Sequence, residues 1–447
     1  MPHDRGTGVP RRVIGPFDAT ALVVGSMIGS GIFIVSAESA RLLGTSGRLL
    51  AVWTAAGLLT LLAALSCAEL AAMFPLAGGP YVFFREAYGE RIGFLFAWTL
   101  LLVVQTGTIA AVAVAFSKFL GALVPSVTGG IAKGVAVLVV AALTGTNALG
   151  VKTGTRTQNV LTVVKYAALL GLTLAGFLIA SKAVGLQTGA HPEMPVPSGG
   201  TLALAFALAF VGPAFAQSAW TNVTFPGAEV RDPGRTLPLA LILGSLLVSI
   251  LYVVANVSYL KVLGLSGIAY APADRVGSAS AEALLPGRGG AWMAAAILVS
   301  TFGCANGLIL SGARVMYALA ADGFFVAPAA RLNRAGVPGV ALVLQAVWTS
   351  LLIASGTYSE LLRYVVAVEF LILILLVLAV PVLRRRRPDA ARPFRTPAWP
   401  LFGGTFVVIA SALVVLLAVG SPRTTWPGFL IVLLGAAVHH AARRRAT

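Results

Sequence analysis

The stretch GSMIGSGIF at residues 25–33 decides how this chain folds. It places three glycines and two serines within seven residues of an otherwise apolar segment. A helix is weakest at Gly29-Ser30-Gly31, because glycine adopts non-helical dihedral angles at little steric cost. Unwinding there leaves backbone N–H groups at the start of the next helical turn, and such groups bind anions. The alternative is close helix packing through Gly25 and Gly29, which have the GxxxG spacing.

The composition around this stretch indicates a membrane protein. Of the 447 residues, 58% are hydrophobic and 11% are charged, and the mean hydropathy is +0.92. Soluble proteins carry about 25% charged residues, because water-facing surfaces need ionic groups. We expect twelve membrane spans, near residues 15–42, 49–74, 86–122, 129–149, 157–182, 200–226, 237–264, 289–321, 338–355, 359–383, 400–420 and 425–442. A spanning helix takes about 20 residues, so these segments leave room only for short loops.

The basic residues predict the orientation. The net charge of +17 is spread over short loops and forms no folded basic face, which argues against a nucleic-acid partner. With the N-terminus in the cytoplasm, that side receives about 20 basic residues and the other side about nine, so the positive-inside rule predicts cytoplasmic termini. The run RRRRPDAARPFR at 384–395 is interpreted as a solvated anchor of this topology rather than a lipid-binding site. Because no signal-peptide pattern precedes the first span, we expect this span to remain in the mature protein. We expect a multi-pass protein of the inner (cytoplasmic) membrane.

A second interruption is expected in the sixth span, in FVGPAFAQSAWTNVTFPGAEV at residues 210–230. Gly212-Pro213 and Pro226-Gly227 weaken this helix. Four polar side chains lie at mid-membrane depth, namely Gln217, Ser218, Thr221 and Asn222. An ordinary kinked helix whose polar side chains bond to its neighbours is the alternative. The first and sixth spans correspond if five spans repeat in inverted orientation, and paired broken helices of this kind indicate a midplane transport site.

Further motifs accompany the two interruptions. They are CAELAAMFPLAGGPYVFFREAYG at 67–89, QNVLTVVKYAALLGL at 158–172, FAQSAW followed by EVRDPGRTLP, SGARVMYALAADG at 311–323 and VLRRRRPDAARPFRTP at 382–397. Together with GSMIGSGIF, they resemble the signatures of the amino acid–polyamine–organocation superfamily. The arrangement is most similar to bacterial relatives of the L-type amino acid transporters and to the proton-coupled ApcT-like proteins. The chain departs from this pattern at Gln217, and at Ala219 and Thr221, where many relatives have Gly and Asn; these departures bear on side-chain selectivity.

The resemblance implies an all-α integral membrane protein with a LeuT-type fold of about 12 transmembrane helices in one domain, residues 1–447. Residues 15–182 and 200–383 would form two inverted repeats of five helices, with helices 1 and 6 broken. Residues 400–442 would add two helices, and residues 1–14 and 443–447 would be cytoplasmic tails.

The resemblance also implies a substrate site at the two breaks. The N–H groups of Ser30, Gly31 and Ile32 would hold a substrate carboxylate, and the carbonyls of Met27, Ile28, Phe215, Ala216 and Ser218 would receive its ammonium group. Gly29, Gln217, Ala219 and Trp220 complete the expected site. The positive and negative ends of broken helices suit a zwitterion. Phe215 resembles the aromatic gate of the family; a Phe facing lipid or the core is the alternative.

Two charged residues lie inside apolar segments. Lys165 either snorkels to the membrane surface or, as the resemblance implies, occupies the place of sodium in sodium-coupled relatives, where its protonation could be reversible. Glu369 is an intramembrane carboxylate and a functional candidate by default. It could relay protons, contact a substrate side chain, or pair with a buried base such as Lys165 or Arg314.

These features predict sodium-independent secondary active transport of amino acids, with neutral ones expected, by proton symport or exchange. Transport of another amine or polyamine is the closest alternative, and a non-transporting sensor or a channel is the alternative of another class. An enzyme is not expected, because HExxH, GxSxG and clustered metal ligands are missing. We expect membrane lipid and possible proton partners but no cofactor or metal. The loop GALVPSVTGG at 121–130 has no cysteine, so no disulfide-linked partner is expected.

Overall fold

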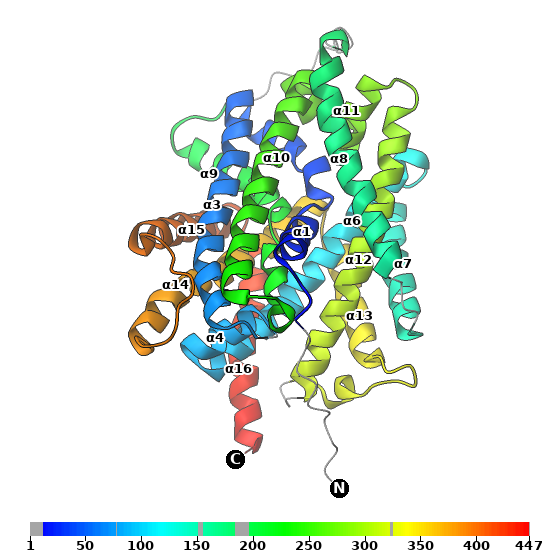
Figure 1. The fold of residues 1–447 in the computed structure, drawn as a ribbon. Helices are drawn as coiled ribbons and strands as arrows, with labels where there is room; N and C mark the ends of the chain where they lie inside the picture. The colour runs from blue at the N-terminus through cyan, green and yellow to red at the C-terminus, as the bar shows by residue number, and fades with distance from the viewer. Residues whose placement is uncertain (1–11, 77, 151–154, 184–195, 322–324, 447) are drawn as a thin grey trace.

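The computed structural model describes residues 12–76, 78–150, 155–183, 196–321 and 325–446. Apart from one isolated bridge between Ile14 and Val230, these residues form helices and the turns between them. The elements are α1 (Pro16–Met27), η1 (Gly31–Phe33), α2 (Ser36–Leu43), α3 (Ser46–Met73), α4 (Pro80–Tyr88), α5 (Glu90–Thr99), η2 (Leu100–Gln105), α6 (Thr106–Leu123), α7 (Gly129–Ala148), α8 (Thr155–Ala183), α9 (Gly199–Ala216), η3 (Trp220–Thr224), η4 (Gly227–Glu229), α10 (Pro233–Ala269), η5 (Pro272–Asp274), α11 (Val276–Leu284), α12 (Gly289–Ala321), η6 (Ala327–Ala330), α13 (Gly339–Ser355), α14 (Tyr358–Arg386), α15 (Trp399–Gly420) and α16 (Pro422–Ala446). Figure 1 shows the resulting bundle, in which the beginning of α1 and the end of α16 lie toward the same end.

Eight helical segments among the described residues are long and apolar enough to cross a membrane. They are Ser46–Met73, Glu90–Leu123, Gly129–Ala148, Gly199–Thr224, Pro233–Ala269, Gly289–Ala321, Tyr358–Arg386 and Trp399–Gly420. Two further expected spans appear as shorter apolar helices, Lys165–Ile179 and Gly339–Ser355. The expected first span is divided into α1, η1 and α2, because the chain unwinds inside it. The number of twelve spans is therefore not confirmed by length and apolarity.

Helices approach one another closely where glycine faces a neighbour. A Cβ atom on Gly57 of α3 would lie 2.8 Å from the Cβ of Ser249 on α10, and one on Gly244 of α10 would lie 2.6 Å from the Cβ of Val23 on α1. Membrane helices associate through such close packing, because lipid supplies no hydrophobic drive between them. These contacts fix α10 between α3 and α1, which sets the position of the break that follows α1.

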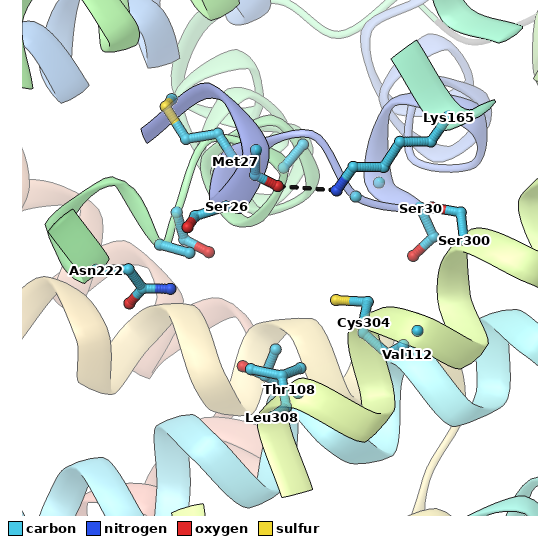
Figure 2. Close-up of a pocket in the computed structure, with 18 of the residues that line it drawn as sticks. Ser26, Met27, Ser30, Thr108, Val112, Lys165, Asn222, Ser300, Cys304 and Leu308 are labelled. Carbon is cyan, nitrogen blue, oxygen red and sulfur yellow. Dashed lines mark hydrogen bonds between the residues drawn. The ribbon is translucent and has the colours of Figure 1, made fainter. Parts of the chain in front are cut away.

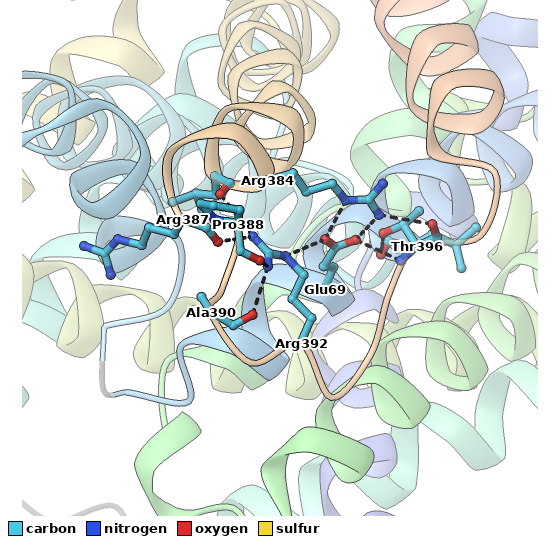
Figure 3. A network of polar contacts seen from close by, with 9 residues as sticks. Glu69, Arg384, Arg387, Pro388, Ala390, Arg392 and Thr396 are labelled. Atoms are coloured by element: carbon cyan, nitrogen blue, oxygen red, sulfur yellow. Dashed lines mark hydrogen bonds and ion pairs between the residues drawn. The ribbon is translucent and has the colours of Figure 1, made fainter.

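A buried ion-pair network closes the end of the bundle at which α14 ends (Figure 3). The side chain of Glu69 on α3 is 1% exposed and accepts hydrogen bonds from Arg384 Nε at 2.9 Å, from Arg384 Nη2 at 2.6 Å and from the backbone N–H of Thr396 at 2.8 Å. Arg392 Nε lies 3.7 Å from the same carboxylate. The arginine run 384–395 is thus partly a packing element, and its interpretation as a wholly solvated anchor is wrong for Arg384 and Arg392.

Candidate functional site

The first helix break lies where the glycine and serine content of GSMIGSGIF predicts it. Helix α1 ends at Met27, Ile28 is extended with φ −73° and ψ 100°, and the chain resumes as the single 3-10 turn η1. Tyr252 of α10 donates its hydroxyl to the carbonyl of Met27 at 3.0 Å and so satisfies one acceptor that the helix end leaves open. The Gly29 N–H is hydrogen-bonded to the Tyr252 hydroxyl, whereas the N–H groups of residues 30–32 donate to no protein acceptor within the described part of the chain. The break therefore presents free donors.

The three glycines of this stretch have different roles. A Cβ on Gly25 would lie 2.6 Å from the Tyr166 hydroxyl, and one on Gly31 would lie 2.8 Å from the Cβ of Ala216, so both sit at close helix contacts. A Cβ on Gly29 would meet no atom nearer than the Met27 carbonyl at 4.0 Å. Packing through the GxxxG pair therefore holds for Gly25 and not for Gly29, which lies in the unwound segment.

The second break lies between α9 and η3. Helix α9 continues to Ala216, Gln217–Ala219 are not helical, and Ala219 adopts the left-handed conformation with φ 69°. This break comes later than Gly212-Pro213, which the sequence suggested as a weak point. Pro213 cannot donate to the Ala209 carbonyl, but the hydroxyl of Ser39 on α2 donates to that carbonyl at 2.8 Å. The helix survives its proline because a distant side chain replaces the missing donor.

The two breaks meet at one cavity of about 740 Å³, and α6, α8 and α12 supply its other walls. Figure 2 shows side chains from all of these elements around it. Eight of the predicted substrate-binding residues line it: Met27, Gly29, Ser30, Gly31, Phe215, Ala216, Ser218 and Ala219. Among the described lining residues, only Asp18 and Lys165 are charged. The cavity is therefore mostly neutral, and its most concentrated polarity is the backbone of the breaks.

The remaining predicted residues lie behind this wall. Ile28 and Ile32 are buried in the core at 2% and 0% exposure. Gln217 accepts a hydrogen bond from the Ser249 hydroxyl at 2.8 Å and donates to the Trp53 carbonyl at 3.4 Å, so its side chain ties the second break to α10 and α3. Gln217, Trp220 and Glu369 line a second, much smaller cavity on the opposite side of the break. The structure does not bring these three side chains to the large cavity.

Lys165 lies at the wall of the large cavity. Its Nζ donates to the carbonyl of Gly25 at 2.8 Å, as the dashed line in Figure 2 marks, and it therefore links α8 to the last turn of α1. The ammonium group is also 5.6 Å from the centre of the Tyr166 ring. The side chain is directed at the first break, which places a fixed positive charge beside the unwound backbone.

Access to the cavity is one-sided. Its lining reaches Asp18 and Leu22 on the N-terminal part of α1, and both residues are exposed. Beyond the break, the packing of Phe33 against α11 closes the cavity. Phe33 is 2% exposed, and a Cβ on Gly277 of α11 would lie 2.7 Å from its ring. The cavity is therefore open toward the end of the bundle where α1 begins.

Ion pairs lie at the sealed end. Glu38 of α2 pairs with Arg363 of α14, and Asp274 of η5 pairs with Arg41 at 2.8 Å and with Lys118 at 3.0 Å. Burial by itself raises the pKa of Asp274, but the positive charges of Lys118 and Arg41 outweigh it and hold that pKa below its ordinary value. These pairs connect α2, α6, α14 and the loop before α11, so they hold this end together.

Sequence reasoning missed the wall formed by α12 and α6. Ser300, Gly303, Cys304, Gly307, Leu308 and Ser311 of α12 all line the cavity. Their spacing of three and four residues puts them on one helical face, and this stripe of small and polar residues was the available signal. Thr108 and Val112 of α6 lie beside this stripe (Figure 2), and Asn222 of η3 was noted only as a polar residue.

A family comparison accounts for two broken helices around a shared cavity. Residues 14–438 match the family model described as amino acid permease. The chain belongs to this amino acid permease family. The resemblance to the amino acid–polyamine–organocation superfamily is thereby confirmed, and the family is one of transporters rather than enzymes.

Relatives support the same assignment over nearly the whole length. The chain is 28% identical to the b(0,+)-type amino acid transporter 1 of Mus musculus, over 91% of this chain and 82% of that protein. It is 29% identical to the large neutral amino acids transporter small subunit 2 of Homo sapiens, over 97% and 81%. It is 26% identical to the serine/threonine exchanger SteT of Bacillus subtilis (strain 168), over 99% of both chains. With its apolar helices, the protein is a multi-pass membrane protein.

Proposed function

We propose that the protein is a sodium-independent secondary transporter of neutral amino acids that works by alternating access. The observation that carries this proposal is the set of free N–H groups at residues 30–32, at a break that lines the same cavity as the C-terminal end of α9. A helix end with free N–H groups attracts a carboxylate, and a helix C-terminus attracts an ammonium group. An α-amino acid carries both charges at the required short separation.

The proposed site consists of backbone more than side chains. The N–H groups of Ser30 and Gly31, with Ile32 behind them, bind the carboxylate. The carbonyls near Met27, Ile28, Phe215, Ala216 and Ser218 bind the ammonium group, and Phe215 covers the substrate. A neutral side chain is favoured because Asp18 lies at the mouth and Lys165 is already bonded to Gly25. Two of the relatives are named for neutral amino acids, namely large neutral amino acids and serine/threonine, which supports this substrate class.

Lys165 supports the absence of a sodium requirement. Its ammonium group donates to an α1 carbonyl next to the break, which is the kind of oxygen that would otherwise coordinate a cation. A fixed positive charge at that place makes a bound sodium ion unnecessary and electrostatically unfavourable.

The proposed fold and topology follow from the paired breaks. We place residues 15–182 and 200–383 in two inverted repeats of a LeuT-type fold within one domain, with 400–442 as additional helices and residues 1–14 and 443–447 as tails. The arginine-rich end of α14 faces the cytoplasm of a cell with the protein in its inner membrane. The cavity, open where α1 begins, is then accessible from the cytoplasm, and the ion pairs around Asp274 close the external side.

The test uses the purified full-length protein in liposomes. A panel of amino acids is assayed for uptake and for counterflow, with the sodium gradient, the pH gradient and the internal substrate varied separately. The proposal expects counterflow of at least one neutral amino acid without sodium. Counterflow of no amino acid would contradict transport, uptake that needs sodium would contradict the role of Lys165, and selective counterflow of a diamine or polyamine would favour that alternative substrate.

A further inference from the structure

A small cavity lies behind the second helix break, and Glu369 of α14 faces it. The cavity measures about 20 Å³, which is room for one water molecule. Its walls come from α3, α9, η3, α14 and α15. Thr60, Gln217, Ser218 and Trp220 contribute its other polar side chains, and the remaining lining is alanine, leucine and phenylalanine.

Glu369 has no counter-charge in this place. Within the described part of the chain it forms no ion pair or hydrogen bond. No described residue that faces the cavity from α3, α9, η3 or α15 is titratable. Lys165, one of the bases suggested by the sequence, lines the other cavity and bonds to Gly25. Pairing with that base is therefore not the role of Glu369.

Contact with a substrate side chain is not its role either, because Glu369 does not line the large cavity. Of the three roles left open by the sequence, proton binding remains. An unpaired carboxylate in apolar surroundings is strongly destabilised, and a proton neutralises it. The cavity has space for the one water molecule that would deliver or accept that proton.

The small cavity shares a wall with the substrate site. Ser218 lines both cavities, and its neighbour Gln217 is held by Ser249 and Trp53. The non-helical segment 217–219 therefore borders both the cavity that Glu369 faces and the proposed ammonium site. A change of charge at Glu369 acts directly on this segment, because an ionised carboxylate needs hydrogen-bond donors and the neutral acid does not.

We propose that Glu369 is the proton-binding group that couples a proton to the movement of the amino acid, through the break at residues 217–219. This inference rests on the proposed transport function. A hydronium ion gives its proton to a carboxylate oxygen and leaves as water, and the reverse transfer occurs when the other side of the membrane is open. Glu369 is protonated when the amino acid is bound. When Glu369 ionises, its carboxylate attracts hydrogen-bond donors of the break, and this movement weakens substrate binding.

The test compares Glu369→Gln with the parent protein in liposomes that contain a pH-sensitive dye, using the amino acid with the largest counterflow. The amide copies the neutral acid in shape but cannot release a proton. The parent should acidify the lumen on addition of substrate and accumulate substrate under an inward proton gradient. Glu369→Gln should keep counterflow within about twofold of the parent and lose both proton signals. Glu360→Gln, which changes a half-buried carboxylate in the first turn of the same helix, should behave like the parent.

Three results would overturn the inference. They are a dye signal in Glu369→Gln equal to that of the parent, loss of its counterflow while the variant remains monodisperse, and counterflow by the parent without proton movement. The last result would still agree with amino-acid exchange, and hence with the proposed function. Only a parent protein without any counterflow would contradict both the proposed function and the inference about Glu369. If the amide prevents folding, Glu369→Met repeats the comparison with a neutral side chain of similar length.

Discussion

The Nζ of Lys165 on α8 donates to the backbone carbonyl of Gly25, 2.8 Å away on α1. This bond joins the two elements at the place where the first helix is about to unwind. It gives the Gly25 carbonyl a hydrogen-bond donor, and it places a positive charge there without a bound metal ion. The relationship makes Lys165 a positioning residue for the first break, while the proton is assigned to Glu369 on the far side of the second.

Two variants of Lys165 separate charge from protonation. Lys165→Ala removes a charge-assisted bond worth about 1.5–3 kcal/mol, which corresponds to a roughly ten- to hundredfold loss of counterflow. Lys165→Arg keeps a charge that does not release its proton, so it should retain more counterflow than the alanine variant and the pH dependence of the parent. Counterflow in liposomes between pH 5 and 8 measures both. An alanine variant with parental transport at every pH would show that the bond does not serve the cycle.

A second prediction concerns Gly31. The structure gives a reason other than unusual dihedral angles, because Gly31 has no positive φ and instead contacts Ala216 so closely that a Cβ would lie 2.8 Å from the Ala216 Cβ. Gly31→Val should push the two breaks apart and abolish substrate binding. Gly29→Ala is the matched control, because its Cβ meets open space and its effect should be small. Binding is measured by substrate-dependent thermal stabilisation; unchanged affinity in a monodisperse Gly31→Val would refute the proposed carboxylate site.

The sequence predicted the helix breaks well and their surroundings poorly. The first break is a local property of Gly29-Ser30-Gly31, so composition revealed it. The second was shifted, because Ser39, far away in the chain, supplies the hydrogen bond that Pro213 cannot make. Gln217 was expected at the substrate, but its bonds to Ser249 and Trp53 depend on the packing of three helices. Such non-local contacts leave no pattern in the sequence.

The α12 wall illustrates a different limit. Its residues at 300, 303, 304, 307, 308 and 311 form a regular stripe, but small residues at this spacing also mark ordinary helix packing. Only the empty space in front of the stripe distinguishes a cavity wall from a helix interface. Glu369 shows the same limit. The sequence places a carboxylate inside an apolar segment, but only the structure shows that it faces a small cavity without a counter-charge among its described lining residues.

A third prediction concerns the network around Glu69. Glu69→Gln leaves Arg384 without its buried counter-charge, and we expect a loss of about 3 kcal/mol, the lower end of the range for breaking a buried pair, because the Arg384 side chain is 33% exposed. Glu86→Gln is the control: its partner Arg387 is 48% exposed, so the loss should stay within about 1 kcal/mol. Thermal unfolding in detergent compares the two, and equal effects would show that burial does not distinguish them.

The ion pairs at the sealed end predict a dependence on pH. The pKa of Asp274 is lower in the folded protein than in the unfolded chain, so its stabilising effect is complete above the unfolded value of about 3.9 and is lost as the pH falls through the folded value. Asp274→Asn should therefore lower the apparent Tm at pH 7 and narrow its difference from the parent below pH 4. A difference that stays constant down to pH 3 would show that the aspartate contributes through packing and not through charge.

The last prediction concerns Ala219, a lining residue of the large cavity whose φ of 69° lies in the left-handed region. This conformation costs a residue with a Cβ about 1–2 kcal/mol and costs glycine almost nothing. Glycine also gives the unfolded chain more conformational freedom, and this lowers the stability gained from relieving the strain by about 0.4–1 kcal/mol. Ala219→Gly should therefore raise the apparent Tm slightly and keep counterflow, whereas Ala219→Val should lower both, because a β-branched side chain resists positive φ. If glycine lowers the Tm as much as valine, the alanine methyl group matters through its contacts, and strain at the break is not the reason.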